Sequence, residues 1–64
     1  MNKFTKTTLK ALSEAGWVFF RQGKGDHEIW HNPSTGKKVT VDGNMKSRHT
    51  ANDTLKKAGL PKAF

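Results

Sequence analysis

Two short segments of strand-forming residues flank a four-residue turn near the middle of the chain. The first, residues 17–22, is aromatic and β-branched and lacks the three- and four-residue spacing of an amphipathic helix. The turn, residues 23–26, contains two glycines, and the second segment, residues 27–31, follows directly. Strands joined by so short a connection pair as an antiparallel hairpin. The sequence therefore predicts a hairpin at the centre of the chain.

A third strand is predicted after this hairpin. Pro33 and Gly36 occupy early and late positions of a second turn, residues 32–36. Residues 37–41 then alternate polar and apolar side chains, which is typical of a half-buried strand. The three strands are expected to form an antiparallel meander, and residues 42–48, which follow neither period, are expected to form a loop.

A helix is predicted before the hairpin, over residues 5–15. Leu9 and Leu12, with Ala11 or Ala15, form its apolar stripe. One of the early threonines is expected to cap its N-terminus, and Gly16 is expected to end it in the left-handed conformation. The candidate capping residues are Thr5, Thr7 and Thr8.

A second helix is predicted to start near His49 or Thr50. Thr50 is the expected N-cap, with Asp53 three residues on in the manner of a capping box. Gly59 is expected to end the helix, and Pro61 prevents it from resuming. The apolar stripe of this helix consists of Ala51, Leu55 and Ala58.

The predicted order is α-β-β-β-α in a single α+β domain spanning residues 1–64. Each helix has one narrow apolar stripe, so both are expected to cover the same face of the three-stranded sheet. This is the topology of a double-stranded-RNA-binding domain. The chain has no cysteine, which excludes disulfides and thiolate metal sites, and no apolar run of the ~18 residues that a membrane span requires. No membrane is expected among its partners, and a cytoplasmic location is expected.

Strand alternation predicts which side chains of the second strand face the core. His27, Ile29 and His31 fall on one side, and Glu28 and Trp30 on the other. Ile29 is expected to join Val39 and Val41 in the core, which places His27 at the edge of the core layer. Trp30 is then expected on the outer face, as a stacking platform or partner contact, whereas Trp17 is expected in the core.

The charge favours a polyanionic partner. The chain carries a net charge of +7, and the bias lies mostly in residues 37–64, with seven basic and two acidic side chains. Backbone N–H groups at the start of the last helix favour a bound anion, with Thr50 and Asn52 as additional donors. The predicted phosphate-binding side chains are Lys24, Lys37, Lys38, Lys46, Arg48, His49 and Thr50. The alternative is a solvated basic face that maintains solubility.

His27 is the candidate acid or base. Cleavage of RNA requires a group that takes the 2′-hydroxyl proton or protonates the leaving oxygen, and imidazole exchanges protons near neutral pH. The alternative is an ordinary histidine bonded to the preceding turn. A zinc site shared by His27 and His31 is rejected, because strand geometry separates them by ~13 Å.

Taken in order, these segments resemble the HicA family of toxin ribonucleases. The resemblance rests on residues 12–22, on 25–33 with the run Gly-Asp-His-Glu-Ile-Trp, on 36–41, on 48–52 and on 55–60. It covers most of the chain, from about residue 9 to residue 60. No single motif is specific, but the ordered set is.

The resemblance implies the fold described above and cleavage of mRNA without a metal or small-molecule cofactor. It implies that His27, in a Gly-(Ser/Asp)-His motif at the start of the second strand, is the catalytic residue. It also implies a HicB-type antitoxin that covers the active site. The +7 surface and an exposed Trp30 are compatible with such an acidic partner, so Trp30 is the expected contact. Many family members carry a second histidine where this chain has Glu28, so a two-histidine pair is not implied here.

Two further hypotheses remain open from the sequence. One is a non-catalytic RNA-binding module of the same fold, in which His27 matters little. The other is a protein that binds an acidic partner through Trp30 and the basic face, with negligible affinity for RNA at physiological salt.

Overall fold

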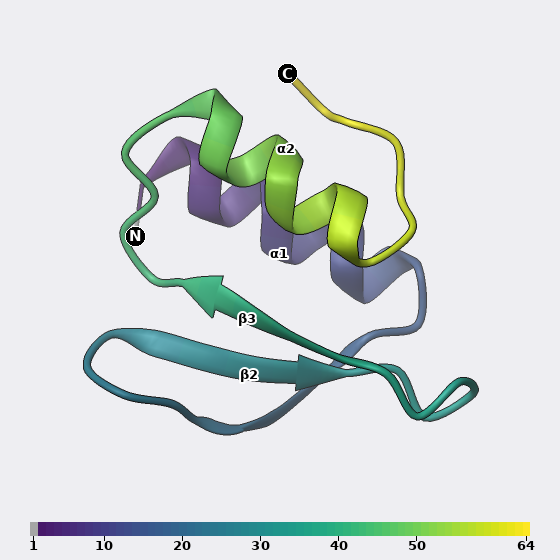
Figure 1. Cartoon of the computed structure of the whole chain (residues 1–64). Helices are drawn as coiled ribbons and strands as arrows, with labels where there is room; N and C mark the ends of the chain where they lie inside the picture. Colours follow the sequence, from purple (N-terminus) through teal and green to yellow (C-terminus); the bar gives the residue numbers. More distant parts are fainter. Residues whose placement is uncertain (1) are drawn as a thin grey trace.

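The computed structural model describes residues 2–64. Figure 1 shows two helices on one side of a three-stranded sheet. The elements in chain order are α1 (Lys3–Glu14), β1 (Val18–Gln22), β2 (His27–His31), β3 (Lys38–Asp42) and α2 (Arg48–Lys57). The predicted α-β-β-β-α order is therefore confirmed, and element boundaries differ from the predicted ones by at most two residues.

The sheet is an antiparallel meander in the order β1-β2-β3. α2 packs against β3 and against α1, so the helical layer lies closest to the β3 edge (Figure 1). The expected arrangement, with both helices on one face, is confirmed. The opposite face of the sheet is free of helices, and this open face is referred to below as the outer face.

The hydrophobic core lies between β3 and the helices. It contains Leu12, Trp17, Val39, Val41, Met45, Ala51 and Leu55, all less than a tenth exposed. The burial of Trp17 was predicted, as was that of Ala51 and Leu55 on one face of α2. Met45 was not, since it lies in the loop between β3 and α2, where no periodicity marks a core position. Its side chain is nevertheless fully buried.

The pairing of β2 with β3 reverses the predicted faces of β2. Trp30 is paired with Val39 and Glu28 with Val41, and cross-strand partners share a face. Trp30 therefore packs against the core, and Ile29 lies on the outer face opposite Thr40. The prediction that Ile29 joins the core and Trp30 faces outward was wrong. Alternation fixes which residues share a face, but the register with a buried neighbour decides which face is inside.

His27 consequently lies on the outer face rather than at the edge of the core. Its cross-strand partner is Asp42, the last residue of β3. The Trp30 indole N–H donates to Glu28 Oε1 at 2.9 Å on the helix side. Glu28 is therefore directed away from His27, as the alternation predicts.

β1 is more exposed than its composition predicts. All five of its residues are exposed, including Val18, Phe19 and Phe20. The expectation that one face packs on the helices and the other is partly covered was wrong, because the helices cover the β3 side of the sheet. A bulge between Phe19 and Arg21 interrupts the register with β2. Such a bulge bends an edge strand and redirects its side chains.

Both helices end as the glycines predict. Gly16 and Gly59 have positive φ angles of 91° and 77°. The amide after each glycine donates back into the last turn, from Trp17 to the Leu12 carbonyl and from Leu60 to that of Leu55, both at 2.9 Å. These are Schellman caps.

The predicted N-caps were wrong at both helices. Asn2 caps α1, its side chain accepting the Thr5 N–H, and Ser47 caps α2, accepting the Thr50 N–H. Both helices begin about two residues earlier than predicted, because Asn2 and Ser47, which precede the predicted caps, provide the capping oxygens. Asp53 belongs to no capping box and instead pairs with Lys57 at 3.3 Å.

Polar side chains of α1 hold the loop between β3 and α2. The Thr5 hydroxyl accepts the Met45 N–H at 3.1 Å and donates to the Asp42 carbonyl at 3.3 Å. Asn2 Nδ2 donates to the Met45 carbonyl at 2.6 Å. Thr8 is also fully buried, and its hydroxyl contacts Met45 Sδ at 3.6 Å. The buried stripe of α1 is thus Thr5, Thr8 and Leu12, with Leu9 only half-buried.

We expect Thr5→Val to lower the free energy of unfolding by about 1–3 kcal/mol, because it leaves the buried Met45 N–H without a partner. Urea denaturation measures this change. Thr7→Val is the matched control, since Thr7 is on the same helix but takes no part in this contact, and it should change the free energy by less than ~0.5 kcal/mol. Equal destabilisation by both variants would contradict the role assigned to Thr5.

Candidate functional site

His27 is held by the turn that precedes it. Its Nδ1 lies 3.1 Å from the Lys24 carbonyl oxygen and 3.5 Å from Asp26 Oδ1. A carbonyl oxygen only accepts hydrogen bonds, so the contact with Lys24 places the proton on Nδ1. Nε2 has no hydrogen-bond partner among residues 2–64 and is the nitrogen free to exchange a proton. The side chain is 45% exposed.

The backbone of His27 is fixed on both sides. Its carbonyl accepts the Gly23 N–H at 2.8 Å and Gln22 Nε2 at 2.7 Å, and its N–H donates to the Lys24 carbonyl at 3.2 Å. Gly25, at the tip of the turn, has a positive φ of 64°, which L side chains rarely adopt. The imidazole is therefore presented from an ordered hairpin turn.

The loop after β3 supports this turn from the other side. The Gly43 N–H donates to the Asp26 carbonyl at 3.1 Å. A Cβ at position 43 would overlap that carbonyl oxygen, so only glycine permits this approach. The Gly43–Asp26 contact joins the β1–β2 turn to the β3–α2 loop next to His27. This contact was not predicted, although a glycine in or next to a strand can mark the close approach of another backbone segment.

An open depression of about 700 Å³ lies on the outer face around His27. It contains two cationic side chains, a carboxylate and a half-buried apolar side chain. Its lining side chains include Arg21, Lys24, Asp26, His27, Ile29 and Thr40. Lys24, predicted to contact phosphate, therefore shares a concave surface with His27.

The predicted phosphate cradle is not one cluster. Lys38 pairs with His31, at the opposite end of β2 from His27, and Lys37 precedes it. Lys46, Arg48 and His49 instead follow the end of β3 that lies beside His27. All five side chains are exposed. The length of β3 separates the two groups by ~13 Å, so a bound chain would have to span the sheet to contact both.

Thr50 and Asn52 do not provide the free donors expected of them. The Thr50 N–H donates to Ser47 Oγ at 3.3 Å, and its carbonyl accepts the Thr54 hydroxyl. The Asn52 side chain bonds the backbone of the C-terminal segment, donating to the Phe64 carbonyl and accepting the N–H groups of Ala63 and Phe64. It therefore fastens the segment after α2.

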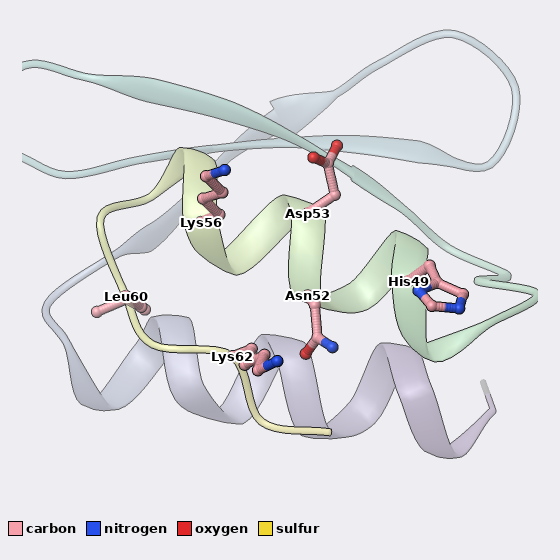
Figure 2. Close-up of a pocket in the computed structure, with 6 residues that line it drawn as sticks. All are labelled: His49, Asn52, Asp53, Lys56, Leu60 and Lys62. Carbon is pink, nitrogen blue, oxygen red and sulfur yellow. The ribbon is translucent and has the colours of Figure 1, made fainter.

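A second hollow, of about 390 Å³, lies between α2 and that segment. Figure 2 shows its lining side chains, with Asn52 directed toward the C-terminal segment beside Lys62. His49, Lys56 and Lys62 make it basic, but Asp53 offsets part of this charge. His27 does not line it. The depression on the outer face is the better candidate site, because its histidine is held by the turn through Nδ1, whereas the His49 side chain has no hydrogen bond among residues 2–64.

Three side chains at the candidate site lie close enough to share a metal ion. Ligand atoms of Asp26, His27 and Asp42 lie within 4.8 Å of one another. This group was not predicted, because Asp42 comes next to Asp26 and His27 only through the pairing of β2 with β3. One oxygen of Asp42 already accepts the Asn44 N–H at 2.9 Å, and all three side chains are solvent-accessible. Asp26 Oδ1 lies 3.5 Å from the imidazole Nδ1, and Asp42 is the cross-strand partner of His27.

Comparison with protein families decides the affiliation of this chain. A family model described as the HicA toxin of bacterial toxin–antitoxin systems matches residues 5–60. The chain belongs to the HicA toxin family. Comparisons with curated proteins and with solved structures gave no match. The suspected resemblance is thereby confirmed, and this HicA-family protein is a toxin of a toxin–antitoxin system.

The toxin has no helix, within residues 2–64, that is long and apolar enough to span a membrane.

We expect Gly43→Ala to displace the turn that carries His27, because the added methyl group would overlap the Asp26 carbonyl oxygen. The imidazole resonances of His27 in a ¹H–¹³C correlation spectrum should shift. Gly36→Ala is the control, because its φ of 74° also penalises alanine, by ~1 kcal/mol or more, but open space surrounds it. Both variants should lose stability, and only Gly43→Ala should move His27. Unchanged His27 resonances in Gly43→Ala would contradict the positioning role.

Proposed function

We propose that this HicA-family toxin is an endoribonuclease that cleaves mRNA through acid–base chemistry at His27, without a metal ion. The observation that carries the proposal is the arrangement of His27 on the outer face. Its Nδ1 is bound to the turn, its Nε2 is free, and the side chain lines a concave surface that also contains Arg21 and Lys24. Membership of a family of toxins supports it.

The chemistry follows from the free nitrogen. Nε2 takes the proton of a ribose 2′-hydroxyl, and the resulting oxygen attacks the adjacent phosphorus. The bond from phosphorus to the 5′-oxygen breaks, and that oxygen leaves with a proton from solvent or from the imidazolium. Negative charge develops on the phosphate during attack, and nearby cations stabilise it most effectively when they are fixed in advance. Arg21 and Lys24 are the cations placed to do so.

The second group of cations extends the RNA-binding surface. Lys46 and Arg48 follow the end of β3 beside His27, and His49 lies in the first turn of α2, whereas the N–H group of Thr50 is already bonded to Ser47. Lys37 and Lys38 lie at the far end of the sheet. In this proposal the two groups of cations hold the RNA chain, one on each side of the cleaved bond.

A HicB-type antitoxin is proposed as the protein partner. A surface with net charge +7 favours an acidic protein, which would compete with RNA for the same cations. Trp30, predicted as its contact, is half-buried on the helix side. Its role in antitoxin binding would therefore depend on the part of the indole that remains accessible beside Phe19.

A non-catalytic RNA-binding module is the second candidate. One observation favours it: His27 is the only histidine of the depression, and Glu28, which stands where many relatives carry a second histidine, points to the opposite face. A lone imidazole provides only one of the two proton-transfer groups that an efficient ribonuclease uses.

We expect His27→Ala to abolish RNA cleavage, a loss of at least ~10²-fold, because it removes the proton acceptor. Purified toxin and variant are incubated with single-stranded RNA in EDTA, and the products are resolved by gel electrophoresis. Ser13→Ala, an exposed change on α1, is the control prepared in parallel and should cleave like the parent. Cleavage by His27→Ala would show that the active site lies elsewhere. If the folded parent binds RNA without cleaving it, the result would support the non-catalytic RNA-binding module instead.

We expect Lys24→Gln to weaken RNA binding and to make it less sensitive to salt. If Lys24 neutralises one phosphate, the slope of log K against log salt should decrease in magnitude by ~0.7 for a single strand. Fluorescence anisotropy over a range of KCl concentrations measures the slope. Lys10→Gln removes the same charge from exposed α1 and should leave the slope unchanged. Equal slopes for both variants would exclude a direct phosphate contact at Lys24.

A further inference from the structure

We infer that the outer face of the sheet contains a second RNA subsite, in which an unpaired nucleobase stacks on Phe20. This inference rests on the proposed function, because it gives the substrate a specified form: single-stranded RNA that lies across the open sheet. It concerns Phe20, His31, Lys38 and Arg21, which contribute nothing to the hydrophobic core.

The bulge in β1 creates the subsite. In a regular strand, successive side chains point to opposite faces. The register with β2 instead pairs Phe19 with Trp30 and Arg21 with Ile29, leaving Phe20 as the extra residue. Arg21 therefore shares the outer face with Ile29. Phe20 lies on that face too, since it contacts His31 and Lys38, which are paired there. An aromatic ring and a guanidinium group thus stand side by side on one face.

The surroundings of Phe20 match those of a base-stacking site. Its ring centroid lies 4.9 Å from that of His31, and Lys38 Nζ lies 5.2 Å from the ring centroid. The residue is 47% exposed. Proteins bind single-stranded nucleic acid by combining accessible aromatic rings with cations that follow the phosphates. Lys38 is exposed, and a lysine ammonium is carried on a flexible four-carbon stem, so it can move to a phosphate when a base covers the ring.

Phe19 provides an internal comparison. It is 51% exposed but lies on the helix side, with its ring centroid 6.3 Å from Trp30 in an edge-to-face arrangement. Phe19 thus matches Phe20 in size, exposure and strand, and differs in the face it occupies. It is remote from His27, because the sheet lies between them.

The position of the subsite defines its relation to the cleaved bond. His31 is four residues from His27 on the same strand and the same face, which corresponds to ~13 Å. The base on Phe20 therefore belongs to a different nucleotide from the one whose 2′-hydroxyl reaches His27. Bases inside a duplex are stacked on their neighbours and cannot cover a ring on a flat sheet, so the subsite selects unpaired RNA.

Binding is tested in the His27→Ala background, so that cleavage does not interfere. We expect Phe20→Ala to weaken binding of a fluorescent single-stranded oligoribonucleotide by about 5- to 150-fold, the loss of one stacked base, or ~1–3 kcal/mol. Phe19→Ala should change it less than about twofold. Phe20→Leu keeps apolar bulk without an aromatic face and should behave like Phe20→Ala. It provides the measurement if the alanine variant does not fold.

A series of oligonucleotides, each lacking one base, identifies stacking directly. One position should weaken binding to the protein with Phe20 and have no further effect on Phe20→Ala. Equal loss from Phe19→Ala and Phe20→Ala, or no position-dependent effect, would overturn the subsite. Unchanged RNA binding with altered self-association in sedimentation velocity would instead assign the patch to protein contact. Cleavage by the parent with RNA binding insensitive to Phe20 would leave the proposed function standing and remove only this inference.

Discussion

The backbone hydrogen bond from Gly43 to Asp26 holds together the two loops on which the candidate site depends. His27 begins β2 and Asp42 ends β3, so the residues that flank this cross-strand pair decide how the imidazole is presented. A side chain at position 43 would force the loops apart. The absence of a Cβ there permits an acid, a histidine and a second acid to gather at one corner of the sheet.

The helical layer stabilises that corner of the sheet, although the hydrophobic core is small. A chain of this size buries few apolar side chains, and α1 contributes only Leu12 to the core cluster. Its other fully buried side chains are Thr5 and Thr8. The Thr5 hydroxyl accepts the Met45 N–H, and the Thr8 hydroxyl contacts Met45 Sδ. Buried hydrogen bonds thus stabilise the packing of α1 where apolar contacts are few. It also links the start of α1 to the loop that supports His27, 22 positions beyond Thr5 in the sequence.

The sequence predicted the elements well because their signals are local. Gly16 and Gly59 end the helices through their own backbone freedom, and the turn before His27 is marked by two glycines. The faces of β2 were not predictable in this way. Ile29 is more apolar than Glu28, yet it faces outward because pairing of Trp30 with Val39 brings the larger aromatic side chain to the core. Likewise, the cap Asn2 and the buried Met45 take part in contacts between distant segments, whereas Ser47 is a local cap whose side chain bonds only Thr50.

The location of His27 on the outer face has a consequence for the candidate site itself. It was expected at the edge of the core layer. On the open face it has a half-exposed side chain, and water reaches it. Electrostatic stabilisation is weaker in contact with water, so the proposed acid–base chemistry at His27 would be favoured only when something covers the depression.

RNA lying across the sheet would itself supply that cover. A base over Phe20 and a phosphate near Arg21 would place the chain along the exposed strand β1 and exclude water from the intervening surface. The large apolar side chains that β1 leaves exposed at an edge are otherwise a liability, because such edges pair with other chains. The bulge and the neighbouring cations disfavour such pairing. They also make the outer face suited to binding a flexible polyanion. Substrate binding and completion of the site are then the same event.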